Sequence, residues 1–129
     1  MSNGTPAEHE ARGKLQALGY FALRSPASKG SVDVIAIRPG VVLFVQVKSG
    51  KTAGGSACRP PEWNRLYELA RKHGAMPVLC IRPWRDTALQ WYRLTGTKRE
   101  GWTGATDHPM EPIDPAGTLA NAKRPTEGT

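Results

Sequence analysis

The sequence predicts a single α/β domain, in which helices flank a central mixed β-sheet. Two apolar runs separated by Pro39-Gly40 are typical of a β-hairpin. Segments with apolar residues at helical spacing lie before and after this hairpin, and two more apolar runs follow the second of them. The resulting order of helix, three strands, helix and two strands indicates helices packed on a mixed sheet.

The first predicted helix covers residues 6–18. Pro6 suits the first turn of a helix, and Thr5 is an acceptable N-cap before it. Gly19 ends the apolar pattern, and residues 20–24 follow as a short strand. The apolar face of the helix consists of Ala7, Ala11, Leu15 and Leu18.

The hairpin strands are predicted over residues 32–37 and 41–48. Both are apolar nearly throughout, as expected when a sheet is covered on its two faces. The polar residues within them are therefore candidates for function. Residues 25–31 before the hairpin have the composition of an exposed loop, and the glycine-rich residues 49–56 after it are predicted to form a mobile surface loop.

A second helix is predicted to begin at Pro60-Pro61 and to end at Gly74. Strands are predicted over residues 77–82 and 88–94. From residue 96 the chain is rich in Gly, Pro, Thr and Ala, so we expect residues 1–95 to form the domain and 96–129 a flexible tail. The apolar face of the second helix consists of Trp63, Leu66, Tyr67 and Ala70.

The composition favours a polyanionic partner. The 129 residues include 18 Lys and Arg against 11 Asp and Glu, a net charge of +7, and neutralising phosphates releases condensed counterions. There is no apolar run long enough for a membrane span and no signal-peptide pattern, so we expect the chain in the cytoplasm. Cys58 and Cys80 show no zinc-ligand spacing and are expected to be free thiols.

The candidate site lies at one end of the hairpin. Pairing about the Pro39-Gly40 turn brings Asp33, near the start of the first strand, close to Gln46 and Lys48, near the end of the second. Gln46 and Lys48 are two residues apart and share a face. A buried Asp and Lys must be paired or must bind something. A structural ion pair is one interpretation, and a metal-dependent phosphodiesterase site is the other.

Phosphodiester hydrolysis needs oxygen ligands for Mg²⁺. Asp33 offers a carboxylate and Gln46 an amide oxygen, while the Val47 carbonyl is a third candidate ligand. Lys48 is expected to orient water or to stabilise negative charge. Glu8 shares the apolar face of the first helix and is preferred over Glu10 as a further ligand, although a surface position for Glu8 stays open.

These residues resemble a known family. The segments Leu18-Gly19-Tyr20, Ser28-Lys29-Gly30, Val32 to Ala36 and Val45 to Lys48 are similar, in order and spacing, to the archaeal-type Holliday junction resolvases of the PD-(D/E)XK nucleases. The resemblance covers roughly residues 7–94. It implies a restriction-endonuclease-like core and a homodimer that nicks opposed strands of a four-way DNA junction with Mg²⁺ or Mn²⁺, in recombination and repair.

The same resemblance assigns site residues. The implied catalytic positions are Glu8, Asp33, Gln46 and Lys48. The implied or expected DNA contacts are Arg24, Ser28, Lys29 and Lys51. The departure is Gln46, because the family usually has Glu there, and the amide removes a negative charge from the metal site.

Two alternatives remain open at this point. One is a nuclease of the same fold that acts on other DNA structures, and the other is a DNA-binding module whose site is degenerate. The candidates for the dimer interface are aromatic side chains, which are more numerous than so small a core readily buries. At least two of them are expected to pack in the core instead. This set consists of Trp63, Tyr67, Trp84, Trp91 and Tyr92.

Overall fold

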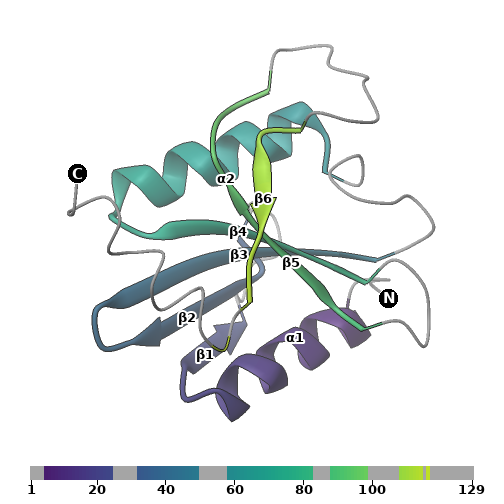
Figure 1. The fold of residues 1–129 in the computed structure, drawn as a ribbon, viewed down its shortest axis with the longest axis vertical. Helices are drawn as coiled ribbons and strands as arrows, with labels where there is room; N and C mark the ends of the chain where they lie inside the picture. Colours follow the sequence, from purple (N-terminus) through teal and green to yellow (C-terminus); the bar gives the residue numbers. More distant parts are fainter. Residues whose placement is uncertain are drawn as a thin grey trace.

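A computed structural model of the chain describes residues 5–24, 32–49, 58–82, 88–98, 108–114 and 116. Six strands and two helices lie within these residues (Figure 1). In chain order they are α1 (Thr5–Ala17), β1 (Phe21–Arg24), β2 (Val34–Arg38), β3 (Val41–Ser49), α2 (Pro60–Lys72), β4 (Met76–Arg82), β5 (Gln90–Leu94) and β6 (Met110–Pro112). Neither described helix is long and apolar enough to cross a membrane.

The strands form one mixed sheet in the order β1-β2-β3-β4-β5-β6. The pair β3–β4 is parallel and the other neighbours are antiparallel. A parallel pair needs a crossover, which α2 provides. The predicted hairpin is confirmed: Val34 pairs with Val45, and Gly40 takes a φ of +78° in the turn. Positive φ favours glycine because it has no Cβ.

The helices cover opposite faces of the sheet (Figure 1). The α1 residues Ala7, Ala11 and Leu15 pack in one apolar cluster, which takes Val78 and Cys80 from β4. Trp63 and Leu66 of α2 pack in a second cluster, which takes the intervening Leu79 and Ile81. Since successive strand residues point to opposite faces, the two clusters lie on the two sides of the sheet. Both cysteines are buried and free, as the sequence predicts.

Strand β6 was not predicted from the sequence. It lies inside the segment expected to be a tail, yet Met110 pairs with Leu94 of β5. Three residues that include a proline carry little strand signal. Side chains of α2 also hold this part of the chain: Trp63 Nε1 donates to the Gly96 carbonyl at 2.8 Å, and Asn64 bonds the Lys98 backbone in both directions. The division into domain and tail stays a prediction, but among the described residues the chain after 95 completes the sheet.

Candidate active site

The hairpin places the candidate site at one end of β2 and β3. Asp33 directly precedes β2, and its backbone N–H donates to the Val45 carbonyl at 2.7 Å. This bond extends the ladder by one step and brings Asp33 beside Gln46. The structure therefore brings together the two polar residues that the hairpin prediction places side by side.

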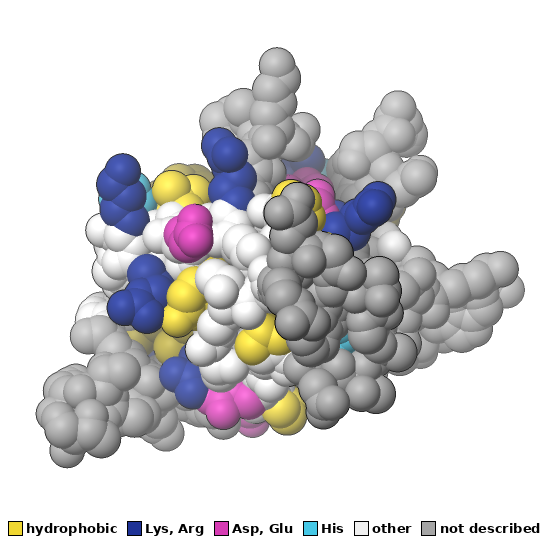
Figure 2. Space-filling view, turned by 90° about the horizontal axis from the view of Figure 1, so that it is seen from above, with side chains coloured by type: hydrophobic (Ala, Val, Ile, Leu, Met, Phe, Trp, Pro, Cys, Tyr) yellow, Lys and Arg dark blue, Asp and Glu magenta, His cyan; other side chains and the backbone are white. Residues whose placement is uncertain are grey.

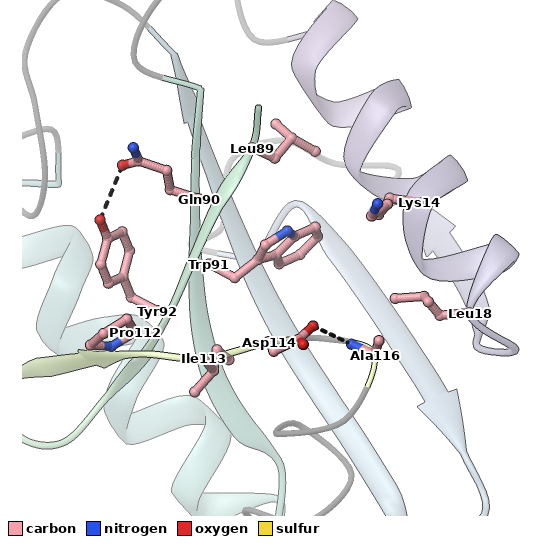
Figure 3. Close-up of a pocket in the computed structure, with 10 residues that line it drawn as sticks. All are labelled: Lys14, Leu18, Leu89, Gln90, Trp91, Tyr92, Pro112, Ile113, Asp114 and Ala116. Atoms are coloured by element: carbon pink, nitrogen blue, oxygen red, sulfur yellow. Dashed lines mark hydrogen bonds between the residues drawn. The ribbon is translucent and has the colours of Figure 1, made fainter. Parts of the chain in front are cut away.

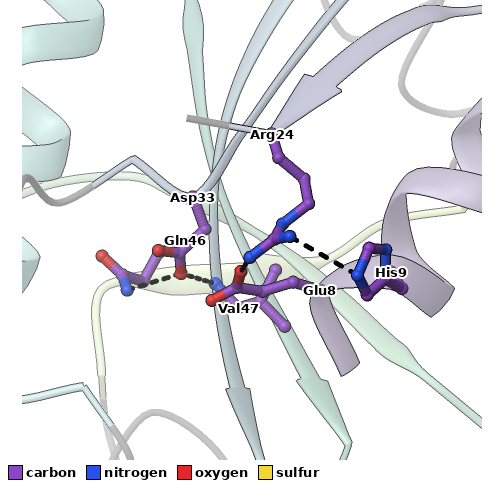
Figure 4. A network of polar contacts seen from close by, with 6 residues as sticks. All are labelled: Glu8, His9, Arg24, Asp33, Gln46 and Val47. Carbon is purple, nitrogen blue, oxygen red and sulfur yellow. Dashed lines mark hydrogen bonds and ion pairs between the residues drawn. The ribbon is translucent and has the colours of Figure 1, made fainter. Parts of the chain in front are cut away.

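The Asp33 carboxylate is held by neutral donors. Its Oδ2 atom accepts hydrogen bonds from Gln46 Nε2 at 2.9 Å and from the Val47 backbone N–H at 2.8 Å (Figure 4). Asp33 and Gln46 are only 8% and 5% exposed. Lys48 pairs with Glu62 instead, so the structural Asp33–Lys48 ion pair considered from the sequence is not formed. Asp33 is thus a buried carboxylate without a cation bonded to it among the described residues.

The Gln46 amide leaves its oxygen available. Its nitrogen faces the Asp33 carboxylate, so its oxygen points away from Asp33 (Figure 4). That Oε1 atom is buried and has no hydrogen-bond partner among the described residues. A buried acceptor without a partner is costly, and a cation would satisfy it.

Glu8 reaches the same region from α1. It is 8% exposed, whereas the Glu10 side chain is 42% exposed and pairs with Arg82. The inward position expected for Glu8 is therefore what the structure has. Its Oε1 atom lies 2.9 Å from Arg24 Nη2, and Arg24 Nη1 lies 3.4 Å from His9 Nε2 (Figure 4).

Burial raises the pKa of Asp33 to about 6. The Val47 N–H and the Lys48 charge oppose this shift, whereas the carboxylates of Glu8 and Glu62 add to it. Three acidic side chains therefore act on one another here. A carboxyl group with a raised pKa among other carboxylates marks a place that favours a bound cation, and such groups concentrate at functional sites.

The raised pKa gives a testable pH dependence. Protonated Asp33 is favoured in the metal-free folded protein, so its contribution to stability is present below about pH 4 and is lost as pH rises through about 6. The asparagine oxygen in Asp33→Asn can accept both hydrogen bonds and does not titrate. We therefore expect the wild type to lose stability relative to Asp33→Asn between pH 4 and 7. Chemical unfolding in EDTA measures this difference, and parallel pH curves would contradict it.

Glu62 was missed by the sequence reasoning. It lies in the first turn of α2, and its Oε1 and Oε2 atoms lie 2.9 and 3.1 Å from Lys48 Nζ. An acidic residue in a first helical turn is ordinary, because it complements the helix dipole. The usable signal in the sequence was its position directly after Pro60-Pro61, where a helix was predicted to follow the glycine-rich segment after Lys48.

The residues fit a hard divalent cation, although not as a cluster of acidic side chains alone. Within the described ranges, no three His, Cys, Asp or Glu side chains are placed to hold one metal ion. The predicted ligands also include the Gln46 amide oxygen and the Val47 carbonyl oxygen. Such mixed oxygen ligands suit Mg²⁺, and the unpartnered Gln46 Oε1 atom supports the fit.

The predicted DNA contacts are only partly described. Arg24 lies at the end of β1 beside Glu8, whereas Ser28, Lys29 and Lys51 lie outside the described residues. In the view of Figure 2, Lys and Arg side chains are spread over the surface with carboxylates between them. On the visible part of this face, the positive charge is distributed rather than gathered in one patch.

A hollow elsewhere contains none of the predicted site residues. This pocket, of about 510 Å³, lies between α1, β5 and the residues after β6, around Trp91 (Figure 3). Its charged lining residues are Lys14 and Asp114, and Asp114 Oδ1 accepts from the Ala116 N–H at 3.0 Å. The described lining residues contain no cluster of acids or bases.

Comparisons with known proteins identify the family and agree with the fold. The family model described as archaeal Holliday junction resolvase (hjc) matches residues 1–103. The fold is similar to that of the Holliday junction resolvase Hjc from Archaeoglobus fulgidus, with a TM-score of 0.60 and 21% identity over 70% of this chain and 71% of that one.

Curated sequence relatives carry less information. A UPF0102 protein of Helicobacter pylori strain G27 is 38% identical over 52 residues, and that of strain P12 is 40% identical over 50. These matches cover 39% and 37% of this chain. They span under half of the relatives, 46% and 44% of their lengths.

Proposed function

This chain belongs to the archaeal Holliday junction resolvase family, and on that premise we propose that it is a DNA endonuclease that resolves four-way junctions by paired, metal-dependent nicks. The observation that carries the proposal is the buried Asp33 carboxylate beside the unpartnered Gln46 amide oxygen, with Glu8 and Lys48 nearby. The net charge of +7 supports a DNA partner, and the proposed place of action is the cytoplasm.

The proposed roles follow from the contacts. Asp33, Glu8, Gln46 and the Val47 carbonyl would hold the cation. When bound, Mg²⁺ or Mn²⁺ supplies positive charge to the reacting phosphate and lowers the pKa of the attacking water. The Lys48 ammonium orients that water or stabilises developing negative charge.

Arg24 has a proposed role in DNA binding. Its guanidinium now pairs with Glu8, and its side chain is about one-third exposed at 34%. It is therefore placed at the rim of the site, where a phosphate could compete for it. Bidentate hydrogen bonding makes Arg well suited to phosphate oxygens. We propose that Arg24 contacts the strand that is cut.

The proposed assembly is a homodimer, because a junction with approximate two-fold symmetry needs two matched cuts. Trp63 and Trp91 are buried, so the aromatic set predicted for the interface is partly core. The large apolar side chains that the described surface exposes are Phe21, Leu23 and Ile37, at 63%, 47% and 42%. Phe21 pairs with Ile37 across β1 and β2, at the sheet edge, so we propose this patch as the contact between two copies.

The test compares a four-way junction with a linear duplex of the same sequence. We expect Mg²⁺-dependent paired nicks in the junction within one complex lifetime, little cleavage of the duplex, and sedimentation at about twice the chain mass of 14.0 kDa. Equal cleavage of both DNAs by a monomer would favour a general nuclease. Junction binding without cleavage in any divalent metal would favour a degenerate site.

A further inference from the structure

Two ion pairs lie beside the Asp33 carboxylate. Arg24 pairs with Glu8 at 2.9 Å, and Lys48 pairs with Glu62 at 2.9 Å. Without Glu62, the two carboxylates of Glu8 and Asp33 would face two cations, and the group would be neutral. A neutral group of charges has little attraction for a divalent cation. Glu62 gives these residues a net negative charge.

Gln46 makes this contribution necessary. It provides an amide oxygen and no charge, although it is the polar neighbour that bonds Asp33 directly. No negative charge from β3 therefore adds to that of Asp33, since the charged side chain at this end of the strand is the cationic Lys48. The additional carboxylate comes from α2, the helix of the crossover between β3 and β4.

Glu62 also fixes the position of Lys48. Both of its carboxylate oxygens lie within 3.1 Å of Lys48 Nζ. The ammonium is close enough to Asp33 to act on its charge, yet the hydrogen bonds recorded for Asp33 come from Gln46 and Val47. Without Glu62, Lys48 would be free to pair with the Asp33 carboxylate and to occupy the oxygen that a cation needs.

The backbone on both sides of Glu62 is held in place. Pro60 and Pro61 open α2, and the next residue, Trp63, has 0% exposure and a hydrogen bond to the Gly96 carbonyl. The first turn of α2 is therefore anchored on the sheet, and the 44% exposed Glu62 side chain extends from this anchored turn to Lys48.

We infer that Glu62 is a positioning residue of the proposed metal site: it supplies the negative charge that Gln46 lacks and holds Lys48 off the Asp33 carboxylate. The inference rests on the proposed function and adds a residue that the family resemblance does not assign. If so, the negative charge that Glu62 supplies should work equally well from another position at the site. A carboxylate placed at position 46 should replace the one at position 62.

The experiment measures Mn²⁺ binding to the whole chain without DNA, by calorimetry and by the Mn²⁺ electron paramagnetic resonance signal. We expect Glu62→Gln to weaken Mn²⁺ affinity about tenfold or more, the effect of roughly one charge near the protein surface. Glu68→Gln removes an exposed carboxylate from the same helix and should leave the affinity within about twofold of wild type. Adding Gln46→Glu to Glu62→Gln should recover most of the loss.

The outcomes separate the inference from the function. Wild-type affinity in Glu62→Gln, or a loss that Gln46→Glu does not recover, would overturn the role of Glu62 while leaving a nuclease in place. A wild-type chain that neither binds Mn²⁺ nor cuts DNA would reject the proposed function as well. Thermal unfolding of each variant checks that a changed affinity does not come from a changed fold.

Discussion

Asp33→Asn is expected to reduce junction cleavage on the order of a thousandfold or more, while junction affinity changes little. The asparagine oxygen can keep the bonds from Gln46 Nε2 and Val47 N–H, because both end on the same Asp33 oxygen. The site therefore keeps its shape and loses only its charge. Affinity should persist because phosphate contacts elsewhere dominate binding.

Single-turnover cleavage and binding in Ca²⁺ measure the two effects separately. Asp114→Asn is a matched control, because Asp114 is exposed and its recorded bond is to the Ala116 N–H. Lys48→Ala should also abolish cleavage, since it removes the ammonium proposed to orient the attacking water or to stabilise developing negative charge. Cleavage at the wild-type rate by Asp33→Asn or by Lys48→Ala would remove that residue from the catalytic site.

Trp63→Ala is expected to lower the free energy of unfolding by about 3–5 kcal/mol, the usual cost of emptying a large buried aromatic site. The side chain has 0% exposure, donates to the Gly96 carbonyl, and lies with its ring centroid 3.9 Å from Lys98 Nζ. It therefore joins α2 to the chain that leads into β6. Removing the Trp63 side chain should therefore destabilise both α2 and the attachment of β6.

Urea unfolding measures the change. Trp63→Phe is the informative companion variant, because it keeps an aromatic ring and removes the hydrogen bond, which should cost about 1–2 kcal/mol. Leu66 lies next along the buried face and remains in place in both variants. Equal stability of Trp63→Ala and wild type would mean that the strand after residue 95 is not anchored as the contacts indicate.

The hairpin end of the site was predictable because two local rules act together there. A two-residue turn fixes which strand residues face each other, and alternation fixes which side they point to. Asp33 and Gln46 therefore had to meet once both strands were identified. Glu8 was predictable for a similar reason, since helical spacing placed it with Ala11 and Leu15.

Glu62 and β6 could not be predicted in this way. The contact of Glu62 with Lys48 depends on how α2 sits on the sheet, which side-chain packing decides and residue spacing does not. Strand β6 depends on β5 already offering an open edge, because Met110–Pro112 has little tendency of its own to be a strand. Both are tertiary effects that override or bypass local sequence preference.

The β2–β3 hairpin has a consequence for how the site assembles during folding. Asp33, Gln46 and Val47 belong to one antiparallel pair of neighbouring strands, so their hydrogen bonds close a short loop. Contacts of short sequence separation form with little loss of chain entropy. Glu8 and Glu62 arrive only when the two helices dock on opposite faces. A nascent chain would thus form the hydrogen bonds of the Asp33 carboxylate first, and would acquire the flanking carboxylates of Glu8 and Glu62 only when the native tertiary structure is complete.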